Sequence, residues 1–154
     1  MLMKGFEIPG LHIQRFDSFS LLESMLCSTE EACRVTVCTY AVTEGWLRRL
    51  ALLKRAGKIS AATLVLDYTV MIRHREKLPL LRGVCDQVYL TNSHAKLMLV
   101  EGCAGFQATA VCSANATNNY RIESYYVSNR TTEVNALRDD LRGILQGAVR
   151  IVGG

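Results

Sequence analysis

The sequence lacks any apolar stretch long enough to cross a membrane. Its longest apolar runs, such as residues 61–66 and 97–100, have the length of strands, far below the roughly 18 residues that a membrane helix requires. Aromatic residues make up only 7% of the chain, and the sequence contains no amphipathic helix rich in exposed aromatic residues that would attach to a membrane surface. We therefore expect no stable membrane association.

The first ten residues lack a continuous hydrophobic stretch and a small-residue cleavage site, so no secretory signal is apparent. On this basis we expect a cytoplasmic protein. The 154 residues are 49% apolar and 21% charged, which is an ordinary globular composition and argues against disorder. No internal repeat or linker divides the sequence, and we expect a single domain over residues 1–154 with a substantial core.

The six cysteines form no Cys-x-x-Cys pair and show no zinc-like spacing with the three histidines. Cys38 and Cys112 lie in strand-like stretches, where a free cysteine behaves as a small buried hydrophobe. Structural thiols are therefore favoured over metal or disulfide use, and redox chemistry is not expected.

The net charge is +4, and the basic residues are concentrated in the middle of the chain. Residues 46–82 contain nine Lys and Arg against Asp67 and Glu76, whereas the first 46 residues are acidic. The nine are Arg48, Arg49, Lys54, Arg55, Lys58, Arg73, Arg75, Lys77 and Arg82. A positive field attracts polyanions such as nucleic acid. On charge alone, however, a solvated helix face is the more common explanation.

Local patterns alternate strands with helices over the first two thirds of the chain. Helices are predicted at residues 18–26, 43–57 and 70–81, and strands at residues 34–42, 61–68 and 87–91. Thr43 can cap the second helix, and Pro79 interrupts the third. This alternation predicts parallel crossover units with helices covering both faces of the sheet.

The pattern changes after residue 91. Residues 95–100 and 107–112 are apolar runs linked by a glycine-containing loop at 102–105, which predicts a β-hairpin and hence a mixed sheet. A further strand is expected at 122–127 and an amphipathic helix at 131–149. The predicted fold class is therefore α/β, an α/β/α sandwich with a central mixed β-sheet.

Polar residues that can act on phosphate gather in the last third of the chain. A His-x-Lys pattern is followed seventeen residues later by Ser-x-Asn, and then by an arginine and a glutamate. The six residues are His94, Lys96, Ser113, Asn115, Arg121 and Glu123. Side chains alternate along an extended strand, so the two members of each short pattern are expected to point the same way. We expect one polar cluster built from two strand ends.

This constellation resembles the signature of the phospholipase D superfamily, which is His-x-Lys, four residues, an acidic residue, then Gly-Ser-x-Asn and a downstream Glu. It departs from that signature at Glu101, where the family usually has Asp, and at Cys112, where it usually has Gly. Neither departure removes a group that touches phosphate, although Cys112 gives a less permissive backbone than Gly and Glu101 changes the local packing. The motif covers residues 92–123, and the resemblance implies a phospholipase D-like fold.

The resemblance also implies a metal-independent phosphodiesterase that requires no cofactor. In this family one His attacks phosphorus to form a covalent phosphohistidine, and a second His protonates the leaving group and then deprotonates water. Lysine supplies the positive charge that other phosphoryl-transfer enzymes take from Mg²⁺. On this basis the catalytic residues are His94, Lys96, Asn115 and Glu123, and the substrate-binding residues are Ser113 and Arg121.

Glu123 and Arg121 can each act in two ways. By accepting a hydrogen bond from an imidazole N–H, Glu123 would orient a histidine ring and favour its charged form. Alternatively, Glu123 caps a strand end or pairs with Arg121. Arg121 in turn either contacts the substrate or supports Glu123.

The sequence encodes only one half of a two-histidine site, because His12 and His74 lack the following lysine. A twofold homodimer would bring two copies of His94 and Lys96 to one site, so we predict that activity requires a homodimer. Nucleic acid is the expected substrate, and the expected activity is that of an endonuclease. The alternatives are a phospholipid-cleaving hydrolase of the phospholipase D type and a non-catalytic nucleic-acid-binding module.

Overall fold

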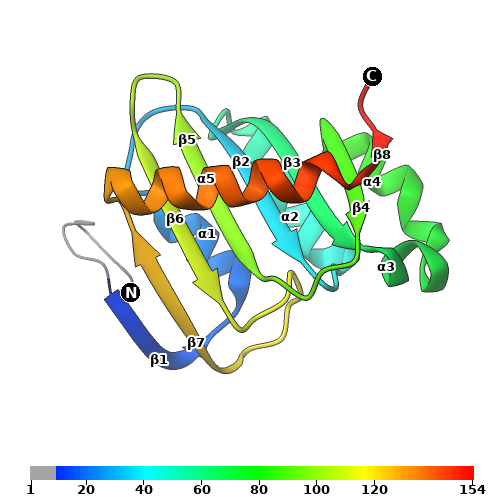
Figure 1. Cartoon of the computed structure of the whole chain (residues 1–154), viewed down its shortest axis with the longest axis horizontal. Coiled ribbons are helices and arrows are strands. Elements are labelled where there is room, and N and C mark those ends of the chain that lie inside the picture. Colours follow the sequence, from blue (N-terminus) through cyan, green and yellow to red (C-terminus); the bar gives the residue numbers. More distant parts are fainter. Residues whose placement is uncertain (1–9) are drawn as a thin grey trace.

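The computed structural model describes residues 10–154, in which eight strands form one mixed β-sheet with helices on both faces (Figure 1). The strands are β1 (Gly10–Phe16), β2 (Cys33–Thr39), β3 (Ile59–Asp67), β4 (Gln87–Thr91), β5 (Leu97–Gly102), β6 (Gln107–Cys112), β7 (Arg121–Ser128) and β8 (Val149–Val152). Their order across the sheet is β1-β7-β6-β5-β2-β3-β4-β8. The predicted α/β sandwich with a central mixed sheet is confirmed.

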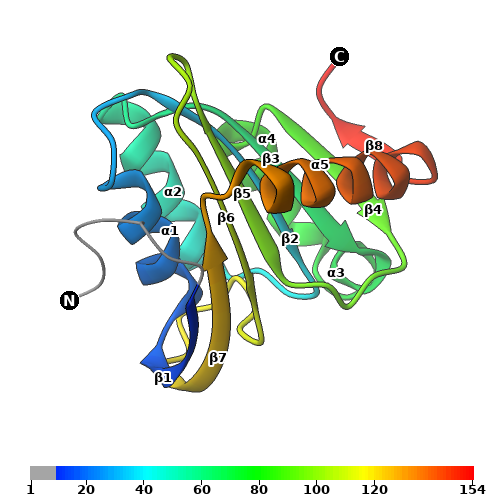
Figure 2. The same cartoon turned by 60° about the vertical axis from the view of Figure 1, so that its left-hand side comes forward.

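The helices divide unequally between the two faces of the sheet. They are α1 (Ser18–Leu26), α2 (Glu44–Arg55), α3 (Tyr68–Arg73), the 3-10 helix η1 (Arg75–Lys77), α4 (Leu78–Val84) and α5 (Thr131–Gln146). Figure 2 shows α1 and α2 on one side of the sheet and α5 alone across the other. Within residues 10–154, every helix falls short of the length and apolar character that crossing a membrane would need.

The strand directions bring several chain ends to one edge of the sheet. Strands β2, β3 and β4 are parallel, so their last residues, Thr39, Asp67 and Thr91, lie at the same edge, which we call the carboxyl edge. Strand β5 is antiparallel to β2 and begins at this edge. Strand β6 ends there and β7 begins there, because each is antiparallel to its neighbour. The opposite edge, where β2 to β4 begin, is called the amino edge.

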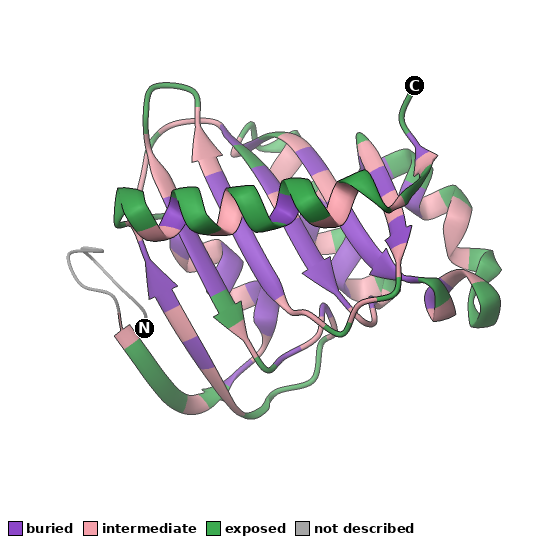
Figure 3. Ribbon diagram, viewed as in Figure 1, coloured by how far each residue is buried: buried purple, intermediate pink, exposed green. Residues whose placement is uncertain are grey.

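Two apolar cores hold the layers together. The larger core contains the buried sides of α1 to α4 and includes Phe19, Trp46 and Tyr125, and the Trp46 indole donates a hydrogen bond to Ser18 Oγ at 3.1 Å. The smaller core lies under α5, where Val134 and Leu141 pack with residues of β2, β3 and β5. Figure 3 shows the outer side of α5 exposed, as the amphipathic pattern of this helix predicts.

Several elements differ from the sequence-based predictions, and the strand expected at residues 34–42 ends at Thr39. The helix expected at residues 70–81 is divided into α3, η1 and α4, and Pro79 lies in the first turn of α4, where its missing N–H costs nothing. The strand expected from Ala95 begins at Leu97. The last helix ends at Gln146 and is followed by β8, which was not predicted. Strand β1 was not predicted either.

Other local predictions are confirmed. Thr43 caps α2, because its hydroxyl oxygen accepts the backbone N–H of Trp46 at 3.3 Å. The β5–β6 hairpin forms, and its loop contains Gly105 in the left-handed region at φ 114°, which glycine adopts without a side-chain clash. Helices do cover both faces, but the helices that follow β2 and β3 all lie on the same face as α1.

Candidate active site

The predicted site residues reach the carboxyl edge from three segments. His94 and Lys96 lie in the loop between β4 and β5. Ser113 and Asn115 follow the end of β6, and Glu123 lies near the start of β7. The backbone N–H of Cys112 donates to the carbonyl of Lys96 at 2.9 Å, so the first two segments are directly joined. These segments therefore lie together at the carboxyl edge, although His94 and Lys96 lie in a loop rather than in a strand.

His94 is exposed and its ring is supported on one side. It stacks on the ring of Tyr40, with 4.2 Å between the centroids and 23° between the planes. The Lys96 ammonium donates to the backbone carbonyl of His94 at 3.0 Å. Within residues 10–154, Lys96 makes no ion pair with a carboxylate. An imidazole and an uncompensated positive charge therefore lie two residues apart at the surface.

Asp67 holds the loop that contains His94, and sequence reasoning missed this role. Its buried carboxylate accepts the backbone N–H of Thr69 at 2.9 Å and that of Ser93 at 3.1 Å. Burial alone would raise the pKa of Asp67, but these hydrogen bonds and the nearby His94 outweigh it and lower the pKa. The aspartate is therefore an anion that fixes the residue preceding His94. Its position at the end of a buried parallel strand was the available signal.

Asn115 is held by groups at the end of β2 and the start of α1. Its side-chain oxygen accepts the backbone N–H of Tyr40 at 3.2 Å and the hydroxyl of Thr39 at 3.4 Å. Its backbone carbonyl accepts the hydroxyl of Ser18 at 2.8 Å. Because these bonds use only oxygen atoms, the NH₂ group of Asn115 remains free of partners in the part of the chain that the structure describes. It can donate to a ligand oxygen.

Ser113 and Glu123 form a pair beside this cluster. The Ser113 hydroxyl donates to the Glu123 carboxylate and accepts the backbone N–H of Ser124 at 3.0 Å. In the single chain the Glu123 carboxylate thus bonds to Ser113 and not to the ring of His94. Arg121, the first residue of β7, is exposed, and over residues 10–154 no salt bridge joins it to Glu123.

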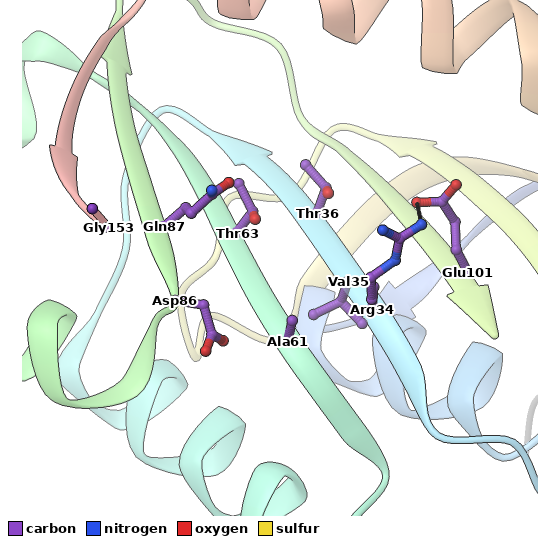
Figure 4. A pocket seen from close by; sticks show the side chains of 10 residues that line it. Arg34, Val35, Thr36, Ala61, Thr63, Asp86, Gln87, Glu101 and Gly153 are labelled. Atoms are coloured by element: carbon purple, nitrogen blue, oxygen red, sulfur yellow. Dashed lines mark ion pairs between the residues drawn. The ribbon is translucent and has the colours of Figure 1, made fainter. Parts of the chain in front are cut away.

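The two departures from the family signature occupy different surroundings. Glu101 lies at the amino edge, where it accepts Arg138 Nε at 2.9 Å and lies 3.7 Å from the Arg34 guanidinium. It lines a cavity of about 400 Å³ there together with Thr36 and Thr63 (Figure 4). Cys112 is half-buried at the end of β6, and burial raises the pKa of its thiol to about 11. Glu101 is therefore remote from His94, and Cys112 carries no charge at neutral pH.

The basic middle segment divides into paired and unpaired side chains. Four members form ion pairs, which are Arg48 with Glu44, Arg49 with Asp17, Lys54 with Asp86, and Lys58 with Glu30. For these residues a solvated, ion-paired face is the correct description. Arg73 and Lys77 differ, because no carboxylate pairs with either in the described part of the chain, and both lie near the carboxyl edge.

A metal centre has no evident ligand set here. Among residues 10–154, no group of three or more His, Cys, Asp or Glu side chains lies close enough together to hold a metal ion. All six cysteines are free thiols, and Cys38 is buried as predicted. The groups available at the carboxyl edge are therefore an imidazole, ammonium and amide donors, a hydroxyl and a carboxylate.

No protein-family model matches the sequence, and no curated protein matches it either. Solved structures, by contrast, match nearly the whole chain. Nuc from Salmonella typhimurium, a phospholipase D family member, has a TM-score of 0.63 and 12% identity over 95% of this chain and 100% of its own. Phosphatidylserine synthase from Haemophilus influenzae has a TM-score of 0.61 and 11% identity over 94% of this chain and 40% of its own.

A third similar structure is TrmBL2, an archaeal chromatin protein, with a TM-score of 0.58 and 10% identity over 92% of this chain and 55% of its own. Identities this low establish the fold alone. The chain therefore has the fold of the phospholipase D superfamily, as the motif predicted.

Proposed function

We propose that this protein is a metal-independent phosphodiesterase, an endonuclease that acts through a covalent phosphohistidine at His94. One observation supports this above the others: His94 stacks on Tyr40, whose backbone N–H donates to Asn115, and Lys96 donates to the His94 carbonyl, so the three residues lie at one edge of the sheet. An unpaired cation and amide donors suit the non-bridging oxygens of a phosphodiester. The exposed imidazole suits attack on phosphorus.

The chemistry needs two imidazoles in different protonation states. The neutral ring of one His94 attacks phosphorus, so that a P–N bond forms while the P–O bond to the leaving group breaks. The leaving oxygen takes a proton from the His94 ring of a second copy. That second ring then removes a proton from water, which attacks phosphorus and breaks the P–N bond. Lys96 and Asn115 stabilise the charge on the non-bridging oxygens throughout.

A second copy of the chain supplies the missing histidine in this proposal. Four apolar side chains, Leu11, Ile13, Val111 and Ile122, are 73%, 73%, 48% and 66% exposed. The strand register places them on one face of β1, β7 and β6, and Figure 3 shows exposed surface along β1 and near the end of β6. Ser124, which lies opposite Ile13 in the register, accepts the backbone N–H of Ser113 at 2.9 Å, so this surface borders Ser113. Burying it against a second copy would remove apolar area from water.

Ile13→Glu tests the dimer. The charge should separate the subunits, so that light scattering reports a monomer and turnover is lost. Leu52→Glu is the matched control, because Leu52 is 60% exposed on α2 and outside the proposed interface, and this variant should remain dimeric and active. A stable monomer that still turns over substrate would refute the shared site.

Turnover in EDTA tests the chemistry. Purified protein should cleave DNA or RNA oligonucleotides with EDTA present, and His94→Ala should abolish cleavage while the circular dichroism spectrum stays unchanged. His12→Ala is the control, because His12 lies on β1 against Tyr125. Mass spectrometry of acid-sensitive adducts should locate the trapped phosphoryl group on His94. Loss of activity in EDTA, or activity in the His94 variant, would contradict the mechanism.

The same experiment separates the alternatives. Phosphatidylcholine vesicles assayed beside the oligonucleotides would be cleaved in preference if the protein were a phospholipid hydrolase. Salt-sensitive DNA binding without turnover would instead indicate a binding module. The similar structures include both a phosphatidylserine synthase and a chromatin protein that binds DNA, so the substrate class has to be decided by this comparison.

A further inference from the structure

A second concave surface adjoins His94 and has no role in the chemistry described so far. It is a cavity of about 350 Å³ between the segment that follows β2 and the α3–η1 segment. Tyr40, whose ring stacks on His94 at 4.2 Å, belongs to its lining. One aromatic ring therefore links the candidate nucleophile and this cavity. Its lining also includes Ala41, which like Tyr40 is partly exposed.

The charged groups of this cavity are of one sign. Arg73, His74 and Lys77 line it, and no carboxylate does. Lys77 is anchored, because its ammonium donates to the carbonyl of Val42 at 2.7 Å. His74 lies 3.2 Å from the Glu76 carboxylate, which offsets any charge on its ring. Arg73 and Lys77 are left as the two net positive charges, and across residues 10–154 neither has an ion-pair partner.

The size and lining of the cavity restrict what it can hold. Small-molecule sites occupy roughly 300–1,000 Å³ and combine apolar walls with a few polar groups. At about 350 Å³ the cavity lies at the small end of that range, which suits one nucleotide and not a base pair. Unpaired cations are the groups that bind phosphate oxygens most strongly.

We propose that this cavity is a subsite for the nucleotide next to the scissile phosphodiester of a single strand. The flanking phosphate is bound by Arg73 and Lys77, and the sugar and base lie against Tyr40 and Ala41. This inference rests on the proposed function, because successive phosphates of one strand would occupy the His94 site and the cavity in turn. The subsite implies a substrate preference: single strands that extend beyond the reacting diester are bound better than the diester alone.

Arg73→Ala tests the subsite, and Arg75→Ala is the matched control. Arg75 is two residues away, and its substitution removes the same charge. Arg75 lines a different cavity, together with Leu90 and Ile151. Two substrates are compared: a single-stranded oligodeoxynucleotide, and bis(p-nitrophenyl) phosphate, which has one phosphate. For Arg73→Ala we expect KM for the oligonucleotide to rise roughly tenfold, as for a lost phosphate contact, and by several times more than KM for the small diester. Arg75→Ala should stay within about twofold of the wild type on both.

Binding provides a readout that does not depend on turnover. In the His94→Ala background, fluorescence anisotropy with the same labelled oligonucleotide should give a Kd that is roughly tenfold weaker after Arg73→Ala than after Arg75→Ala. Equal losses in the two variants, or equal losses on the two substrates, would overturn the subsite while leaving the phosphodiesterase intact. Absence of cleavage by the wild-type protein would overturn the proposed function, and the anisotropy difference would still decide the subsite.

Discussion

The charged side chains that line the two edges of the sheet differ in their partners. At the amino edge Glu101 lies between Arg34 and Arg138, and Asp86 binds Lys54 at 2.7 Å. The Asp86 carboxylate also accepts the backbone N–H of Ala62 at 2.7 Å. At the carboxyl edge Lys96, Arg73 and Lys77 have no carboxylate partner in the described chain, and the buried anion Asp67 binds backbone instead.

The two edges therefore differ in whether their charges are paired within the fold or available to bind a ligand. Paired charges at the amino edge are satisfied within the fold, so a ligand there would have to displace an existing ion pair. At the carboxyl edge Lys96 and Arg73 retain their charge for an incoming anion. Cavities exist at both edges, of about 400 and 350 Å³, so the presence of a cavity does not distinguish them. The state of the charges does.

Lys96→Ala should give the largest effect that follows from this comparison. Removing one stabiliser of transition-state charge typically costs roughly 100–1,000-fold in kcat. The melting temperature should change little, because the ammonium makes one exposed hydrogen bond. Arg34→Ala, which removes a cation from the amino edge, is the control and should keep the activity. Comparable activity in the two variants would contradict the proposed difference between the unpaired cation and the paired one.

Asp67→Asn should reduce both stability and turnover, because the carboxylate orders the His94 loop. Losing a buried hydrogen bond to a charged group costs roughly 2 kcal/mol in the free energy of unfolding, and misplacing His94 should lower kcat roughly tenfold. The folded pKa lies below the unfolded value, so this stability is present above about pH 4 and is lost as the pH falls through the lower folded pKa.

Urea titrations of Asp67→Asn and the wild type across pH would measure this contribution. The difference between them should persist from pH 7 to about pH 4 and shrink below. Asp139→Asn, on the exposed side of α5, should match the wild type throughout. A constant difference down to pH 2 would show that the carboxylate is not held as an anion.

Glu101→Ala should reveal the amino edge as structural. The carboxylate is 21% exposed and binds Arg138 at 2.9 Å, so its loss should cost about 1 kcal/mol in the free energy of unfolding. The kcat should remain within about twofold of the wild type, because the residue lies at the opposite edge from His94. A large fall in kcat without loss of stability would place Glu101 in the reaction.

Thiol labelling should have the smallest consequence for activity. Cys27 and Cys103 are exposed and should react rapidly with Ellman's reagent. Burial raises the pKa of Cys33, that of Cys38 and Cys85 to about 12, and that of Cys112 to about 11. These four thiols therefore stay protonated and react slowly near neutral pH. Two thiols should therefore react before unfolding, with turnover unchanged. Rapid labelling of Cys112 with loss of activity would indicate an open carboxyl edge.

Local periodicity predicted the central strands because each of them is a buried apolar run bounded by turn residues. The parallel strands β2, β3 and β4 were each located from buried apolar runs. The two outermost strands of the sheet, β1 and β8, were missed for different reasons. Strand β1 pairs with β7, more than 100 residues away, and its apolar residues Leu11 and Ile13 face outward. Strand β8 is four residues long, and its apolar pattern continued that of α5.

The site residues were located by their order and spacing, but their supporting contacts could not be. Tyr40 and Asp67 contact the His94 segment from 54 and 26 positions away, and no short pattern reports such contacts. The hydrogen bond from the Ser113 hydroxyl to the Glu123 carboxylate is likewise known only from the structure. Its predicted role toward His94 stays a prediction for the assembled site.

The contacts of Asn115 are expected to form late during folding. Its hydrogen bonds reach Tyr40 and Thr39 across 75 and 76 residues, and Ser18 across 97. Such distant contacts close slowly during folding. During refolding, the helical signal should therefore recover first and turnover should follow, because the reactive arrangement exists only after the first and last thirds of the chain have met.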